Sequence, residues 1–197
     1  MENKIKNDLR MDKRLRAVFG EIDLGSVTSS PADTREGILA EQESEEAKQI
    51  KAITSMVSNS PHFKELVPET GLVTTTKEFI SQPDGNRIKI QYIRPDTDEE
   101  LPCVYYIHGG GMMVYSCFDE MYAAWGRCIA RQGVGVAMVD FRNAMWESSA
   151  PEIEPFPAGL NDCVSGLKWV HASAKELNID QNRIIIAGES GGGNLTI

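Results

Sequence analysis

The sequence of 197 residues contains no hydrophobic run that approaches the roughly 20 apolar residues of a membrane span. Its first eight residues include no apolar segment, which argues against a secretory signal there. Positive charge is also scarce, because 20 lysines and arginines face 29 aspartates and glutamates, for a formal net charge of −9. Such an acidic chain suits neither nucleic acid nor an anionic membrane surface. We therefore expect a cytoplasmic protein that binds neither nucleic acid nor membrane.

Cysteine and histidine are rare, and neither forms a pattern typical of a metal site. The sequence has four cysteines and three histidines, and no two cysteines have the Cys-x-x-Cys spacing. The sequence therefore predicts reduced cysteines in or near a core, and neither a disulfide framework nor a zinc site. With no cluster of metal ligands, we expect no metal and no other cofactor. The cysteines are Cys103, Cys117, Cys128 and Cys163.

The first part of the chain has helical patterning. Apolar residues recur at loosely helical spacing over about 5–22, and a second helix is predicted over about 35–57. From Leu72 the pattern changes to strand-like alternation, and two such segments flank the turn 83–86, which predicts a β-hairpin. We therefore divide the chain into a helical segment, 1–70, and a second domain, 71–197.

Three short apolar runs alternate with helical segments in the rest of the chain. The runs lie at 103–107, 134–140 and 183–187, and helices are predicted over about 119–132 and 158–177. Strands that alternate with helices in this way form right-handed βαβ crossovers and a parallel sheet. The fold class predicted from this pattern is α/β.

The third run leads directly into Gly188-Glu189-Ser190-Gly191-Gly192. A Gly-x-Ser-x-Gly motif between a strand and a helix is typical of a nucleophile elbow, in which the serine lies at a strained turn. The helix expected to begin near Gly191 would direct free N–H groups and its positive dipole end toward this serine. Taken alone, the motif also fits a glycine-rich turn that cradles a phosphate.

A second motif, His108-Gly109-Gly110-Gly111, follows the first run. Loops at the carboxyl ends of parallel strands form the binding edge of such a sheet, so this loop is expected near Ser190. Three consecutive glycines allow backbone N–H groups to approach a ligand without obstruction by side chains. The alternative is that these residues form only a tight turn.

The two motifs together resemble the hormone-sensitive-lipase group of α/β-hydrolases, the bacterial family IV esterases. The segments 139–142 and 155–163, which includes an Asp162-Cys163 pair, are also similar to that family. The resemblance covers about 71–197, and the helical N-terminus is similar to part of the family's cap. It implies an α/β-hydrolase fold, with a mostly parallel sheet flanked by helices and a helical N-terminal cap segment.

The resemblance also implies a reaction, the hydrolysis of short-acyl carboxylic esters through an acyl-enzyme intermediate. The partner would be a small-molecule ester. The implied roles are the nucleophile, Ser190; the oxyanion donors, Gly110, Gly111 and Gly191; the loop support, His108; and the substrate contacts, Met112, Met113 and Tyr115. For the last three residues, ordinary loop packing is the alternative interpretation.

The sequence departs from the family pattern in three places. Gly191 stands where the family usually has alanine, and Tyr115 stands where a small residue is common. The larger side chain of Tyr115 would narrow the substrate pocket. The segment 140–144 differs from the usual family sequence after its first residue, which predicts a reshaped loop.

A histidine base and an acid normally follow the serine in this fold, yet only seven residues follow Ser190. The histidines His62, His108 and His171 all precede it. We therefore expect this chain to be the N-terminal half of an enzyme, completed by the same polypeptide or by a second chain. Association between copies of the chain stays open as a further partner interaction.

Two other functions fit the same motifs. A relative that has lost the catalytic histidine would bind a small ligand without hydrolysing it. A lipase or peptidase on the same fold would need a larger groove for a long acyl chain or a peptide.

Overall fold

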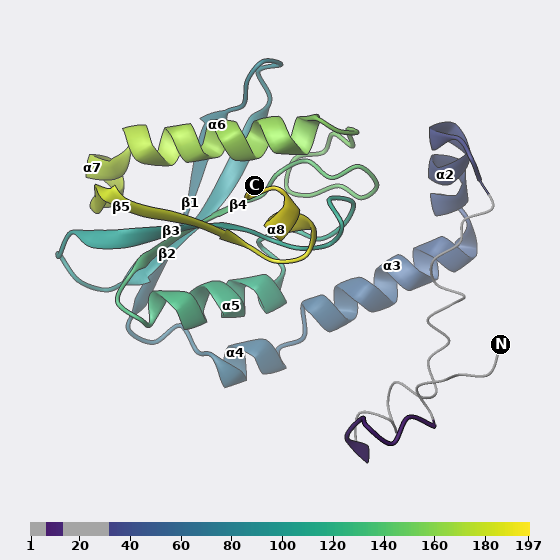
Figure 1. Cartoon of the computed structure of the whole chain (residues 1–197), viewed down its shortest axis with the longest axis horizontal. Coiled ribbons are helices and arrows are strands. Elements are labelled where there is room, and N and C mark those ends of the chain that lie inside the picture. The colour runs from purple at the N-terminus through teal and green to yellow at the C-terminus, as the bar shows by residue number, and fades with distance from the viewer. Residues whose placement is uncertain (1–6, 14–31) are drawn as a thin grey trace. The chain divides into compact units, whose positions relative to one another are not determined.

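The computed structural model describes residues 7–13 and 32–197. The backbone divides into two compact units between Gln49 and Ile50. The first unit includes helix α2 (Arg35–Gln42) and the start of α3 (Glu45–Ser58), and the second contains the sheet and its helices (Figure 1). The helix predicted over about 5–22 lies mostly outside the described residues. None of the helices in the described ranges is long and apolar enough to cross a membrane.

The prediction of a single helix over about 35–57 is wrong, because the structure has two helices in this range, α2 and α3. Helix α2 ends at Gln42, and the N–H of Glu43 donates to the carbonyl of Ala40. Ser44 then starts α3, since its Oγ accepts a hydrogen bond of 3.1 Å from the N–H of Ala47. A serine in this position caps a helix and offers the backbone an alternative to helix continuation.

The sheet has five strands in the order β1-β2-β4-β3-β5. Strands β1 and β2 form the predicted antiparallel hairpin, closed by a 2.8 Å hydrogen bond from the N–H of Ser81 to the carbonyl of Asn86. Strand β3 pairs in parallel with both β4 and β5, which confirms the predicted parallel arrangement. The strands are β1 (Leu72–Ile80), β2 (Arg87–Pro95), β3 (Leu101–Ile107), β4 (Gly135–Val139) and β5 (Ile179–Gly188).

Helices cover both faces of this sheet. Helix α6 (Ala158–Ala172) lies along one face, and α5 (Glu120–Ala130) lies along the other (Figure 1). The short helices are α4 (His62–Leu66), α7 (Ala174–Leu177) and α8 (Gly191–Asn194). Side chains of β3 alternate between the two layers, as they must in a pleated strand. Tyr105 belongs to the core on the α6 side and Tyr106 to the core on the α5 side.

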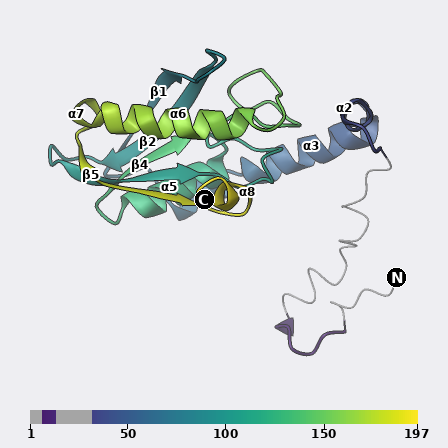
Figure 2. The ribbon, with the colours of Figure 1, turned by 45° about the horizontal axis from the view of Figure 1, so that its top comes forward.

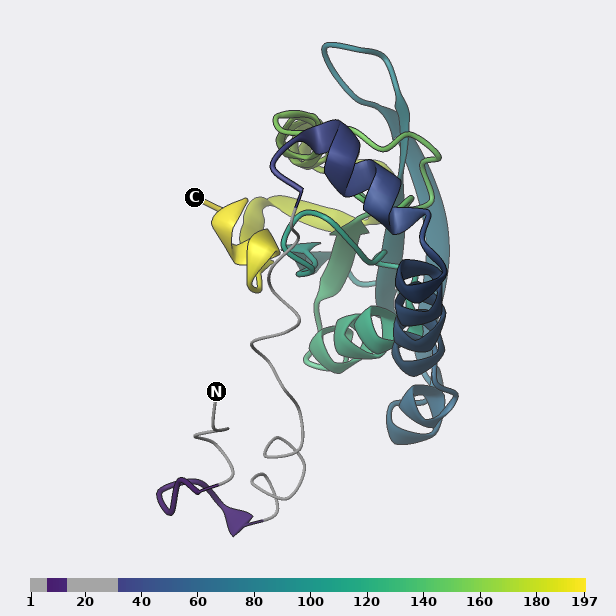
Figure 3. The same ribbon diagram turned by 90° about the vertical axis from the view of Figure 1, so that its right-hand side faces the viewer.

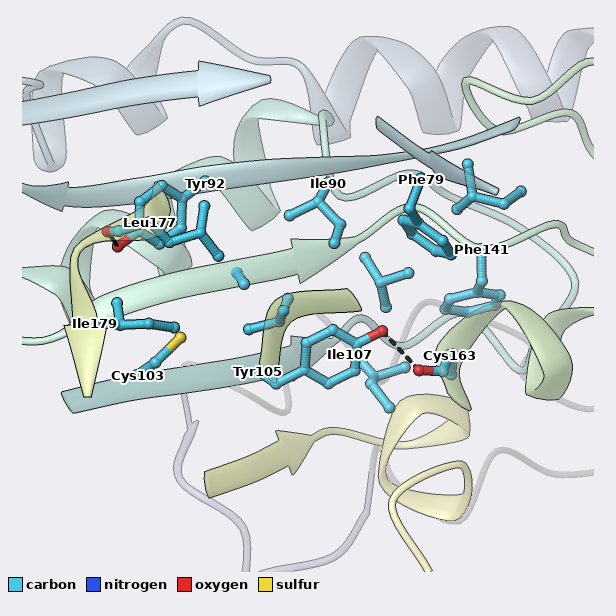
Figure 4. Packing of buried hydrophobic residues seen from close by; sticks show 14 of the residues in the cluster. Phe79, Ile90, Tyr92, Cys103, Tyr105, Ile107, Phe141, Cys163, Leu177 and Ile179 are labelled. Carbon is cyan, nitrogen blue, oxygen red and sulfur yellow. Dashed lines mark hydrogen bonds between the residues drawn. The ribbon is translucent and has the colours of Figure 1, made fainter. Parts of the chain in front are cut away.

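The core beneath α6 is mainly apolar, and the buried hydroxyls of its tyrosines are hydrogen-bonded. Figure 4 shows Tyr105 among Ile107, Phe141 and Cys163, and its hydroxyl donates a 2.8 Å hydrogen bond to the carbonyl of Cys163. A buried hydroxyl without a partner would be destabilising, so this bond favours the packing of α6 on β3 that the structure shows.

Strand β5 forms one edge of the sheet, and the hairpin lies on the opposite side (Figure 3). The strand pairs only with β3 among the strands of the described residues. Two of its apolar side chains are open to solvent, with Ile185 62% and Ile186 43% exposed. These side chains point to opposite faces, as successive residues of a strand do. The β5 edge is therefore apolar on both of its faces.

An ion pair inside the second unit joins the two segments that resemble the family outside its motifs. Arg142 follows β4, and its Nε and Nη2 donate to the two carboxylate oxygens of Asp162 on α6 at 2.9 and 2.8 Å. The hydroxyl of Ser81 donates to the same carboxylate at 2.5 Å. Asp162 is fully buried, whereas Asp84, the second acidic partner of Arg142, is 41% exposed.

Replacing Asp162 by alanine is expected to lower the free energy of unfolding by about 3–5 kcal/mol, because it leaves the buried Arg142 guanidinium without its main partner. The matched control is Asp84→Ala, which removes the exposed partner and should lower that free energy by about 1 kcal/mol or less. Urea unfolding of the two variants measures both values. Equal effects of the two substitutions would contradict the assignment of Asp162 as the structural partner.

Candidate active site

Strand β5, at the edge of the sheet, leads into the short helix α8 (Figure 2). Ser190 lies in the turn between the end of β5 and the start of α8. Its backbone has φ 50° and ψ −120°, a conformation that residues with a side chain rarely adopt. The flanking glycines permit this turn, since a Cβ on Gly188 would lie 2.5 Å from the carbonyl oxygen of Gly192. The predicted strand, sharp turn and helix are all present, and Ser190 is exposed at the turn.

The loop His108–Gly111 lies beside this turn because β3 and β5 are neighbours. Ile107 at the end of β3 is in register with Gly188 at the end of β5. The approach is close, since a Cβ on Gly191 would lie 2.9 Å from the nitrogen of Gly111 and 2.8 Å from that of Met112. An alanine, the usual family residue, would require the loop to move away.

The predicted oxyanion donors have free backbone N–H groups. Within the described residues, the N–H groups of Gly110, Gly111 and Gly191 donate to no other backbone group. Those of Gly111 and Gly191 belong to residues in direct contact. Unused N–H groups at a helix start and in an adjacent glycine loop can bind a developing negative charge.

His108 is buried beneath the glycine loop, with 1% of its surface exposed. Its ring stacks on Phe141 with centroids 4.4 Å apart, and Nδ1–H donates a 2.8 Å hydrogen bond to the carbonyl of Gly109. Burial lowers the pKa of the imidazole, which favours the neutral form. A neutral, buried ring that bonds the loop fits the predicted support of that loop.

A cavity of about 630 Å³ opens next to the glycine loop. Its wall includes Gly111 and two of the predicted substrate contacts, Met112 and Met113, but Tyr115 is not part of it. Apolar side chains supply most of the remaining wall, as is usual in sites for small molecules. These other residues are Arg142, Ala144, Glu154, Phe156, Gly159, Leu160, Asn194, Leu195 and Ile197.

Tyr115 packs against the other side of the glycine loop. A Cβ on Gly110 would lie 2.8 Å from Cδ2 of Tyr115, so this ring supports the loop directly. Tyr115 has φ 76°, and its carbonyl accepts a 2.7 Å hydrogen bond from Nδ2 of Asn143. A role for Tyr115 in substrate binding stays a prediction.

Asp140 was not singled out as a site residue from the sequence, yet it organises the segment after the glycine loop. It is fully buried at the end of β4. Its Oδ1 accepts hydrogen bonds from the hydroxyl of Ser116 at 2.7 Å and from the N–H of Cys117 at 2.8 Å. Its Oδ2 accepts one from the N–H of Ser149 at 2.6 Å. An aspartate directly after a buried strand was the sequence signal for this role.

None of the three histidines forms a hydrogen bond with Ser190. His62 is exposed at the start of α4 and pairs with Glu65 at 3.1 Å, and His171 is exposed near the end of α6. His108 is committed to the glycine loop. In the part of the chain that the structure describes, no group of three potential metal ligands occurs either.

Comparison with known proteins gives a consistent result. A family described as alpha/beta hydrolase fold matches residues 104–197. Carboxylesterase NlhH of Mycobacterium tuberculosis (strain CDC 1551 / Oshkosh) is 35% identical over 133 residues, which are 67% of this chain and 38% of that protein. The structure of esterase Est22 is 54% identical with a TM-score of 0.91 and covers 100% of this chain and 56% of its own.

A more distant structure links the chain to one group within the fold. It is that of brefeldin A esterase, described as a bacterial homologue of human hormone sensitive lipase, with 29% identity and a TM-score of 0.62. The match covers 85% of this chain and 44% of that one. The chain thus spans 38% of the curated carboxylesterase and about half of the solved esterases. The chain therefore has the α/β-hydrolase fold, and it is similar to esterases that include a homologue of hormone-sensitive lipase.

Proposed function

We propose that the protein containing this chain hydrolyses short-acyl carboxylic esters and that Ser190 is its nucleophile. The observation that carries the proposal is the strained turn at Ser190, which exposes the serine beside free N–H groups of the glycine loop. The similarity to carboxylesterases supports the choice of ester substrates.

In the proposed reaction the Oγ of Ser190 attacks the ester carbonyl carbon and gives up its proton to a base. The tetrahedral intermediate collapses, the C–O bond to the alcohol breaks, and the alcohol leaves with that proton. Water then attacks the acyl-enzyme, releases the carboxylic acid and restores the serine hydroxyl. The base lies in a part of the protein beyond these residues, since none of the three histidines here contacts Ser190.

The oxyanion of each tetrahedral intermediate would accept hydrogen bonds from the N–H groups of Gly110, Gly111 and Gly191. Donors fixed in position before the reaction stabilise the developing charge without reorganisation, and each typically contributes about 3–4 kcal/mol to lowering the barrier. The two loops that carry them are held close by the contact of Gly191 with Gly111. In this proposal His108 supports the loop and transfers no proton.

The acyl group would lie against Met112 and Met113, in the cavity that borders Gly111. The volume of about 630 Å³ lies within the range of small-molecule sites.

We expect the complete protein to hydrolyse p-nitrophenyl acetate and butyrate faster than the palmitate, and to keep its activity in the presence of EDTA. Every proposed reacting group is a protein group, so a chelator has nothing to remove. Initial rates on the three esters, with and without EDTA, measure both expectations. A preference for palmitate would favour a lipase. Loss of activity in EDTA would refute the cofactor-free mechanism. Binding of an ester without turnover would favour a protein that binds a small ligand and does not hydrolyse it.

A further inference from the structure

We propose that Tyr122 and Glu189 act as a brace that positions the glycine loop against the nucleophile turn. Glu189 directly precedes Ser190, and Tyr122 is on α5, which packs on the opposite face of the sheet from α6. The hydroxyl of Tyr122 donates a 2.9 Å hydrogen bond to Oε1 of Glu189. The bond thus links the turn to a helix that is fixed by its own core.

The brace lies directly over the start of the glycine loop. A Cβ on Gly109 would lie 2.6 Å from Oε1 of Glu189 and 3.1 Å from the hydroxyl oxygen of Tyr122. The backbone of Gly109 therefore lies in contact with both groups of the hydrogen bond. If the bond is lost, the carboxylate is free to leave Gly109, and the loop loses its contact on this side.

The ring of Tyr122 extends the same support along the loop. Its centroid is 5.3 Å from that of His108 and 6.0 Å from that of Tyr115 in an edge arrangement. Tyr115 in turn contacts Gly110. Tyr122 thus reaches each end of the loop segment 108–110, through a side chain that is itself 4% exposed.

The hydrogen bond joins a buried phenol, that of Tyr122, to the carboxylate of Glu189, which is exposed. Burial raises the pKa of Tyr122, and the adjacent Glu189 carboxylate raises it further, so the phenol keeps its proton. A hydrogen bond to an ionised acceptor is stronger than one between neutral groups. Within the described residues, the Tyr122 hydroxyl is the side-chain donor that bonds Glu189.

Both residues act through the glycine loop, so they are positioning residues. Only the expected effect of the brace on the reaction rate rests on the proposed function. In the complete protein, we expect Tyr122→Phe to lower kcat by about tenfold or more and to change KM by less than about twofold, because a small displacement of oxyanion donors affects mainly the transition state. Glu189→Gln keeps an oxygen acceptor and should retain most of the rate, whereas Glu189→Ala should match Tyr122→Phe.

The matched control is Tyr92→Phe. The Tyr92 hydroxyl is also buried and donates a 2.8 Å hydrogen bond, to the carbonyl of Leu177, but it belongs to the core on the α6 side. This variant should lose similar stability without a change in kcat. A combined Tyr122→Phe and Glu189→Ala variant should be no slower than either single variant, since the two changes remove one interaction.

A second measurement does not depend on catalysis. Amide hydrogen exchange of the peptide covering 108–115 should be faster in Tyr122→Phe than in the wild type, Glu189→Gln and Tyr92→Phe proteins, because the loop has lost its contact. If the wild type hydrolyses no ester, the proposed function fails. The amide exchange rates still show whether Tyr122 and Glu189 hold the glycine loop in place. Unchanged exchange in Tyr122→Phe, an unchanged kcat in an active protein, or equal effects of Tyr92→Phe would overturn the inference.

Discussion

Replacement of Ser190 by alanine is expected to lower kcat of the complete protein by roughly four to six orders of magnitude. The substitution removes the oxygen that forms the acyl-enzyme bond in the proposed mechanism, while the glycine loop and the cavity remain. The substrate affinity should therefore change little, because the groups that contact the ester are still in place. Steady-state rates on p-nitrophenyl acetate and equilibrium binding of an unreactive ester analogue measure the two quantities.

The fold of this variant should be unaffected, because Ser190 makes no side-chain hydrogen bond within the described residues and is exposed. A matched control is Ser173→Ala at the end of α6, which also removes a serine hydroxyl and should leave kcat at the wild-type value. Activity of Ser190→Ala within tenfold of wild type would exclude this serine as the nucleophile.

The second large effect concerns residues 1–197 expressed alone, which we expect to show no turnover of a short-chain activated ester. Without an adjacent histidine, the hydroxyl of Ser190 stays protonated at neutral pH and is a poor nucleophile. The nearest histidine in the chain order, His171, is exposed at the end of α6, and His108 is buried under the loop. Free N–H donors alone support only a residual acceleration, on the order of 10³–10⁴ over water in a well-formed site.

Labelling with a fluorophosphonate separates this expectation from simple misfolding. Circular dichroism and urea unfolding report whether the chain is folded, and the label reports whether the serine is activated. A folded chain with slow, incomplete labelling and no ester turnover is the expected result. Stoichiometric labelling with normal turnover would mean that these residues include a base, and the proposal of a base elsewhere would then be wrong.

This chain is also expected to associate with other copies or to precipitate when expressed alone. Strand β5 is an edge strand, and Ile185 and Ile186 expose apolar surface on its two faces. Long apolar edge strands readily pair with other chains. A further strand from the rest of the protein would cover this edge, which is the proposed place of the completing segment.

The order and type of most elements could be predicted from local patterns. Alternation identified the hairpin, and apolar runs separated by helical segments predicted the parallel strands, which the structure confirms. Two predicted helices were wrong in their continuity. The helix predicted over about 35–57 is divided between α2 and α3 by a serine cap, and the helix predicted over about 158–177 is divided at Ser173 between α6 and α7. The division of the chain at residue 70 stays a prediction.

The sequence by itself determined the turn at Ser190, because a glycine on either side of a serine, between a buried strand and a helix, allows few other backbone paths. It also determined that the glycine loop would be near that turn, since carboxyl ends of parallel strands share one edge of a sheet. Only the tertiary structure decided which side chains hold the two together. Tyr122 and Glu189 are 67 residues apart, and their hydrogen bond depends on how α5 packs against the sheet. The same holds for Arg142 and Asp162, which pair because α6 lies across the end of β4. Such contacts join residues that are distant in sequence, and no local periodicity encodes them.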